Sequence, residues 1–132
     1  IHGAYFKSNR DRGGAITEVF IRDVTIGRAQ AAISLTTDYH GYRGGDFPTI
    51  FENISIENLT CGEAIVGLSL VGAEGAPLGR IALRDVTIGA AKVPLRTRNA
   101  PAMTFERVRI GPATIMPQAN TGPETFSDRL RF

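Results

Sequence analysis

The residues best suited to bind a ligand lie near the amino terminus, where a lysine precedes a pair of glycines. Residues 3–14 read Gly-Ala-Tyr-Phe-Lys-Ser-Asn-Arg-Asp-Arg-Gly-Gly. Strand-like alternation places Phe6 in the core and directs Lys7 outward. Its ammonium could hold a carboxylate by a charge-assisted hydrogen bond, and Gly13-Gly14 would let the backbone approach a ligand closely. The alternative is a solvated Lys7 and glycines that only form a tight turn.

A polar and aromatic loop carries the second group of candidates. Residues 37–46 read Thr-Asp-Tyr-His-Gly-Tyr-Arg-Gly-Gly-Asp and form the longest insertion in the chain. Tyr39 could hold a sugar through its hydroxyl and its ring, or it could fasten the loop to the strands beneath it. His40 and Arg43 are candidates for outer subsites, with a plain surface position as the alternative.

Two further basic residues, Arg96 and Arg98, alternate on a later strand, where we expect both to point outward. If Lys7 occupies the corresponding strand three layers earlier, they lie about 14 Å from it at the usual strand spacing. They could therefore contact a neighbouring unit of an acidic polymer. A solvated basic face is the alternative.

A recurring pattern predicts the elements that position these residues. The order apolar-x-apolar-x-corner-apolar-x-apolar occurs at 19–26, 54–61, 81–88 and 103–110. Period-two alternation indicates strands, and the shift of phase at the corner indicates a bend. A second strand follows at a fixed distance from each of the first three corners, with the mostly apolar sets Ala31/Ile33/Leu35, Val66/Leu68/Leu70 and Val93/Leu95/Thr97.

We therefore predict an all-β fold, a right-handed parallel β-helix (solenoid) of about four to five coils, with a β-sandwich as the alternative. The coils would cover residues 1–119, and 120–132 would form a C-terminal cap or tail. Corner residues Asp23, Asn58 and Asp85 are expected to stack in a column and to bond the backbone of the turn. Loops 37–50 and 72–80 would project from one side.

Composition narrows the functional classes. The 132 residues make at most one domain, and 15 basic against 13 acidic residues give a net charge of +2, which is not typical of nucleic-acid binding. No apolar run is long enough to span a membrane. The single Cys61 excludes an internal disulfide, and neither a metal nor another cofactor is expected. Because the chain opens on strand-like sequence at Ile1, we expect further coils to precede it.

The opening segment, together with Tyr39, resembles the Arg-x-Lys segment and following Gly-Gly loop of glycoside hydrolase family 28, the polygalacturonases. The resemblance implies that Lys7 binds a sugar carboxylate at the cleavage site, with Tyr39 assisting and Arg12-Gly13-Gly14 forming the adjoining loop. Tyr5 stands where the family has its arginine. A phenol can stack on a sugar or donate one hydrogen bond, but it lacks a bidentate cationic fork. That difference points to another uronide or to a modified end group.

The resemblance further implies an inverting, metal-free hydrolase of α-1,4-galacturonosyl links in pectin, monomeric as the intact protein and secreted or periplasmic in a bacterium. Its partner would be polygalacturonate or a related acidic polysaccharide. Inversion needs two carboxyl groups, one acid and one base. The family's catalytic aspartates are expected upstream of Ile1, so no catalytic residue is assigned and this chain alone is expected to be inactive. The alternative is a non-catalytic β-helix that binds carbohydrate or serves a structural role.

Overall fold

The computed structural model describes residues 2–118, and this part of the chain is all-β, with six strands and no helix. The strands are β1 (His2–Lys7), β2 (Ala15–Thr36), β3 (Ile50–Val71), β4 (Ile81–Arg98), β5 (Met103–Ile110) and β6 (Ala113–Thr114). They form one sheet in chain order, parallel from β1 to β5 and antiparallel between β5 and β6. The all-β prediction is confirmed, whereas the predicted cap or tail at 120–132 lies outside the described residues.

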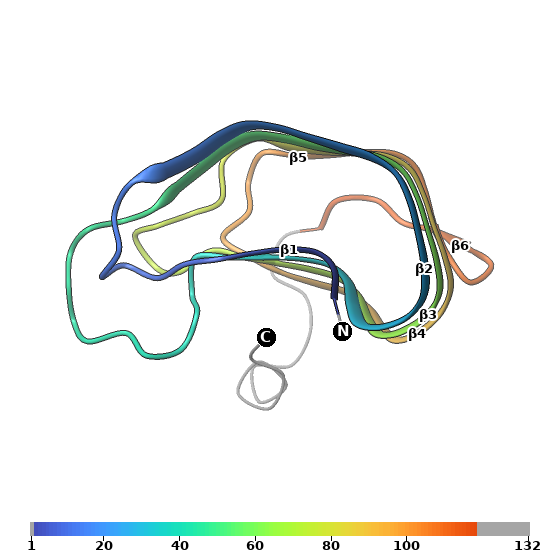
Figure 1. Ribbon diagram of the computed structural model, residues 1–132, viewed down its shortest axis with the longest axis horizontal. Helices are drawn as coiled ribbons and strands as arrows, with labels where there is room; N and C mark the ends of the chain where they lie inside the picture. Colours follow the sequence, from blue (N-terminus) through green and yellow to red (C-terminus); the bar gives the residue numbers. More distant parts are fainter. Residues whose placement is uncertain (1, 119–132) are drawn as a thin grey trace.

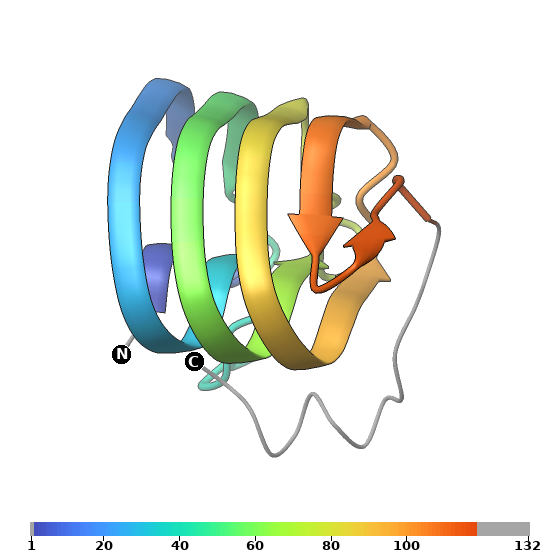
Figure 2. The same ribbon diagram turned by 90° about the vertical axis from the view of Figure 1, so that its right-hand side faces the viewer.

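The long strands β2, β3 and β4 bend, and they follow nearly the same path when viewed end-on (Figure 1). Viewed from the side, they lie next to one another in sequence order (Figure 2). Their register matches the repeat found in the sequence. Ile54 pairs with Val19 on one side and Ile81 on the other, and Val66 pairs with Ala31 and Val93. Both predicted strand sets of each repeat therefore align across the sheet.

The predicted corner residues have left-handed backbone conformations that bend the strands. Asp23, Asn58, Asp85 and Arg107 have φ of 60°, 54°, 53° and 54°. Asn and Asp tolerate this region better than most residues, because their short polar side chains bond locally. Neighbouring corners contact each other through side chains: Asn58 Nδ2 donates to Asp23 Oδ1 at 2.7 Å, and Arg107 forms an ion pair with Asp85. The corner residues therefore stack in pairs as expected. The hydrogen bonds and ion pairs of these pairs join one side chain to another, whereas bonds to the backbone of the turn were predicted.

Apolar side chains on both sides of each corner fill the space enclosed by the bent strands. In β3, Ile56 and Leu59 on either side of the corner are both buried, as are Leu68 and Leu70 further along. Stacking of equivalent residues from successive strands buries an apolar face that one strand could not bury alone. The core thus stabilises the parallel alignment of the strands.

The connecting segments gather on one side of the stack. Residues 8–14, 37–49, 72–80 and 99–102 lie at the left of Figure 1, next to the carboxyl end of β1. The prediction that the loops at 37–50 and 72–80 project from one side is confirmed. Because parallel strands end at the same edge, the segments that leave them are brought together there.

Candidate functional site

Lys7 and Tyr39, which are 32 positions apart in the sequence, form a direct contact beside this loop cluster. Lys7 is the last residue of β1, is exposed and pairs with Thr36 near the end of β2. Its Nζ donates to the Tyr39 hydroxyl at 3.2 Å and lies 4.3 Å from the centre of the Tyr39 ring. The Tyr39 backbone N–H donates to the Ser8 carbonyl at 3.0 Å and holds the ring there. The two residues to which the resemblance gives a role in sugar binding are therefore in direct contact.

The same loops make further contacts, two of which have the same sequence separation. Arg10 Nη2 donates to the Tyr42 hydroxyl at 2.6 Å, and the Arg43 backbone N–H donates to Asp11 Oδ2 at 2.6 Å. The Gly45 N–H donates to Asp11 Oδ1 at 2.7 Å. These bonds fasten loop 37–49 to segment 8–14 and fix the walls of the site.

A groove of about 690 Å³ opens between the two segments, and we call it the lysine groove. Its charged and aromatic lining comprises Lys7, Arg12, Tyr39, His40, Arg43 and Asp11. The structure thus brings together five of the residues predicted from the sequence. Three cations face one carboxylate, and both oxygens of that carboxylate already accept backbone N–H groups. The groove is therefore suited to an anionic ligand, with ring faces available for a sugar.

Gly13 and Gly14 were predicted to allow a ligand close to the backbone, but neither lines the groove. Their φ values are 66° and 76°, a conformation that side chains disfavour. The Gly13 N–H donates to the Phe47 carbonyl at 2.8 Å, and the Ile50 N–H donates to the Gly14 carbonyl at 3.0 Å. This geometry agrees with the alternative interpretation, a tight turn that leads into β2.

The predicted residue Tyr5 does not line the lysine groove, although its ring lies close to Lys7. Its ring stacks on His2 with the centres 4.2 Å apart, and Lys7 Nζ lies 5.7 Å from the Tyr5 ring centre. Its buried hydroxyl has no hydrogen-bond partner among the described residues. Burial, followed by the neighbouring Tyr39 side chain, raises the pKa of the Tyr5 phenol well above its usual value. Tyr5 therefore supports the Lys7 ammonium and stays uncharged.

The two later arginines are less exposed than predicted. The register places Arg98 in line with Lys7 through Thr36 and Val71, three strands further along the sheet, as expected. Arg98 is half-buried and forms an ion pair with Asp38. Arg96 is 8 % exposed rather than open to solvent. Its Nη1 donates to Ser69 Oγ at 3.5 Å, and Ser69 is its pairing partner on the neighbouring strand β3.

A second groove of about 620 Å³ adjoins the first, and we call it the arginine groove. It is lined by Asn9, Arg10, Asp38, Tyr42, Glu74 and Arg98, among others, and Asn9 also lines the lysine groove. Arg10 was not among the predicted site residues. The sequence contains a signal that could have identified Arg10, because Arg10 precedes Tyr42 by the same 32 positions that separate Lys7 from Tyr39.

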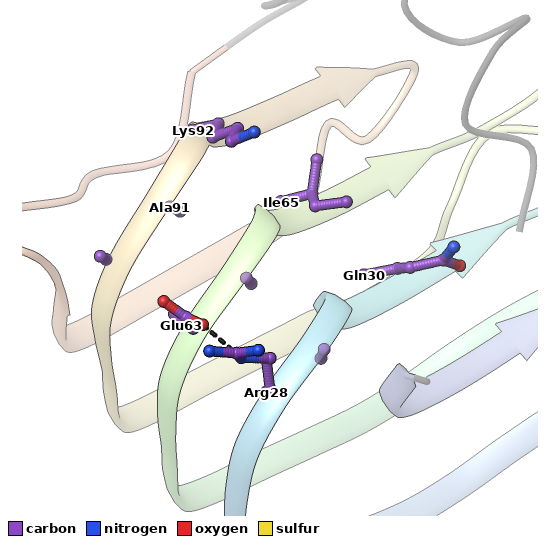
Figure 3. Close-up of a pocket in the computed structure, with 9 residues that line it drawn as sticks. Arg28, Gln30, Glu63, Ile65, Ala91 and Lys92 are labelled. Carbon is purple, nitrogen blue, oxygen red and sulfur yellow. Dashed lines mark ion pairs between the residues drawn. The ribbon is translucent and has the colours of Figure 1, made fainter.

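A third groove, of about 660 Å³, lies on the outside of another bend, away from the loops (Figure 3). Its floor consists of alanines aligned across the sheet, Ala29, Ala64 and Ala91, and an ion pair joins Arg28 to Glu63 at its rim. None of the predicted site residues lines this groove. Its apolar floor is a poor match for a charged saccharide.

Residues 2–118 contain no group of three or more His, Cys, Asp or Glu side chains arranged to hold a metal ion. Within the same residues, no helix could cross a bilayer. No protein-family model, curated protein or solved structure matches the chain. The candidate functional residues are those that line the two loop-side grooves.

Proposed function

We propose that the chain is a right-handed parallel β-helix whose lysine groove binds a carboxylate of an acidic polysaccharide such as polygalacturonate. The β-helix is supported by the in-register parallel pairing of three bent strands, by the left-handed corners and by the general right-handedness of parallel crossovers. One observation carries the binding proposal: Lys7 and Tyr39 meet at 3.2 Å in a groove with three cations and one already satisfied carboxylate.

We further infer that this binding serves a pectin-degrading glycoside hydrolase of the polygalacturonase type, secreted or periplasmic, that cleaves α-1,4-galacturonosyl links with inversion. The contact between Lys7 and Tyr39 supports this, because the resemblance had assigned both residues to the cleavage site. Inversion needs an acid and a base spaced to admit water. Asp11 is the one carboxylate among the described lining residues of the lysine groove, and backbone N–H groups occupy both of its oxygens.

That single, occupied carboxylate favours a second candidate function, a β-helix that binds uronides without cleaving them. Neither candidate places a catalytic carboxylate pair among the described residues of the lysine groove, so both make the same prediction for the purified chain. Purified chain incubated with polygalacturonate should release no reducing ends. Sustained release would show that a catalytic pair is present in the chain and would exclude the purely binding role.

The binding proposal is tested by retention on immobilised polygalacturonate at low salt. We expect Lys7→Ala to weaken retention about tenfold or more, because a charge-assisted hydrogen bond contributes on the order of 1.5–3 kcal/mol. Lys92→Ala is the matched control, since it removes an exposed lysine from the outer bend, where it lines the apolar third groove. Equal retention of both variants and the unmodified chain would refute carboxylate binding by Lys7.

A further inference from the structure

We propose that the arginine groove binds an uncharged sugar unit, so that the ligand joins a uronic acid in the lysine groove to a neutral sugar beside it. This inference rests on the proposed function and specifies its substrate class. It predicts a preference for mixed acidic and neutral oligosaccharides over a polymer in which every unit carries a carboxylate.

The two grooves are arranged as neighbouring subsites. Asn9 lines both, and the loop contacts between them form a shared wall. Along that wall Arg10 and Tyr42 face the arginine groove, whereas Asp11 and Arg43 face the lysine groove. Arg98, in line with Lys7 but three strands away, lies about 14 Å further along the stack at the usual strand spacing. A ligand that reaches both grooves is therefore longer than one monosaccharide.

The charges that line the arginine groove cancel. Arg10 and Arg98 are balanced by Asp38 and Glu74, in contrast to three cations against one carboxylate in the lysine groove. Arg98 is paired with Asp38. Arg10 donates to the Glu74 carbonyl at 2.7 Å and to the Tyr42 hydroxyl at 2.6 Å. A sugar carboxylate would have to displace Asp38 or lie close to it, and either arrangement is unfavourable.

A neutral sugar meets no such obstacle. Its hydroxyls both donate and accept hydrogen bonds, so the guanidinium and carboxylate groups of this groove can each engage them. Tyr42 adds an aromatic surface that is 42 % exposed, and Arg10 lies 4.9 Å from its ring centre. The groove therefore combines donors, acceptors and a ring, and the formal charges of its lining residues sum to zero.

The test measures binding of two oligosaccharides of equal length by titration calorimetry, using the 132-residue chain. One is an oligogalacturonate, and in the other galacturonate alternates with a neutral hexose. We expect the alternating compound to bind about tenfold more tightly, and Lys7→Ala to weaken both. Equal or tighter binding of the oligogalacturonate, with Lys7→Ala still weakening both, overturns this inference and leaves the proposed function intact. If Lys7→Ala weakens neither, the proposed function fails as well.

A substitution in the groove gives a second, independent test. Asp38→Asn removes the carboxylate that neutralises Arg98, and we expect it to abolish the tenfold preference by improving oligogalacturonate binding. Asp46→Asn is the control, because it makes the same charge change at an exposed position of the same loop that does not line either groove. An unchanged preference in Asp38→Asn, or the same change in both variants, would overturn the inference. Unfolding curves of the two variants would check that each is folded.

Discussion

Replacing Gly62 with alanine tests the stacking of strands that positions the site. Gly62 lies between Cys61 and Glu63, whose partners on β2 are Ile26 and Arg28, so it is stacked directly on Gly27. A Cβ added at Gly62 would lie 2.6 Å from the Gly27 carbonyl oxygen. Ordinary contact begins at 3.4 Å, so the two strands would have to separate by about 0.8 Å at this bend.

Overpacking of this kind destabilises proteins by about 1–3 kcal/mol. Gly27→Ala is the matched control, because a Cβ at Gly27 would meet no atom within 4 Å. Both substitutions reduce the conformational entropy of the unfolded chain by the same amount, so this contribution cancels in the comparison. We therefore expect Gly62→Ala to have a free energy of unfolding about 1–3 kcal/mol lower than Gly27→Ala.

Urea unfolding followed by circular dichroism measures this difference from the transition midpoints, provided that the dependence on denaturant is the same in both variants. Equal stability of the two variants would refute the reasoning, because it would mean that Gly62 does not stack on Gly27.

Two further predictions concern the core and the support beneath Lys7. Leu68→Ala should lower the free energy of unfolding by about 2–5 kcal/mol in urea, because Leu68 is fully buried; Ile65→Ala, at a position 36 % exposed, should lower it much less. The raised pKa of Tyr5 means that the folded state favours the neutral phenol. The contribution of this phenol to stability is therefore complete below about pH 10, and it is lost as pH rises through the pKa of the folded state. Alkaline titration by tyrosinate absorbance should show one of the three tyrosines ionising last, and Tyr5→Phe should remove that step; a late step that persists would contradict it.

The sequence predicts the strands well because their side chains obey a strict period. Alternation identified the strands, and the shift of phase at Asp23, Asn58 and Asp85 located bends that the structure confirms by positive φ. The aligned apolar sets also follow from the sequence, since equal offsets from equivalent corners must coincide when the strands pair in parallel. Among the four corners, only Arg107 is not the Asn or Asp expected there, and it forms an ion pair with the neighbouring corner residue Asp85.

The site is less predictable because its geometry depends on how loops without periodicity pack. Neither the burial of Arg96 nor the pairing of Arg98 with Asp38 follows from strand alternation, which assigns a face but not the neighbours on it. The resemblance named Lys7 and Tyr39 but gave no reason to include Arg10. A search for the offset of 32 positions would have found it, because Arg10 and Tyr42 are separated by the same number of positions as Lys7 and Tyr39.

That repeated offset is set by the parallel pairing of β1 with β2 together with the path of the segments that leave these strands. The last residue of β1, Lys7, pairs with Thr36, 29 positions later, and Tyr39 lies three residues beyond that pair. The segments after β1 and β2 then run beside each other, so one constant separation joins Lys7 to Tyr39, Arg10 to Tyr42 and Asp11 to Arg43. A change in the register of β1 against β2 would therefore move all three contacts together. The pairing of β1 with β2 therefore positions the wall that the lysine groove and the arginine groove share, and mutations that disturb this pairing should impair both grooves at once.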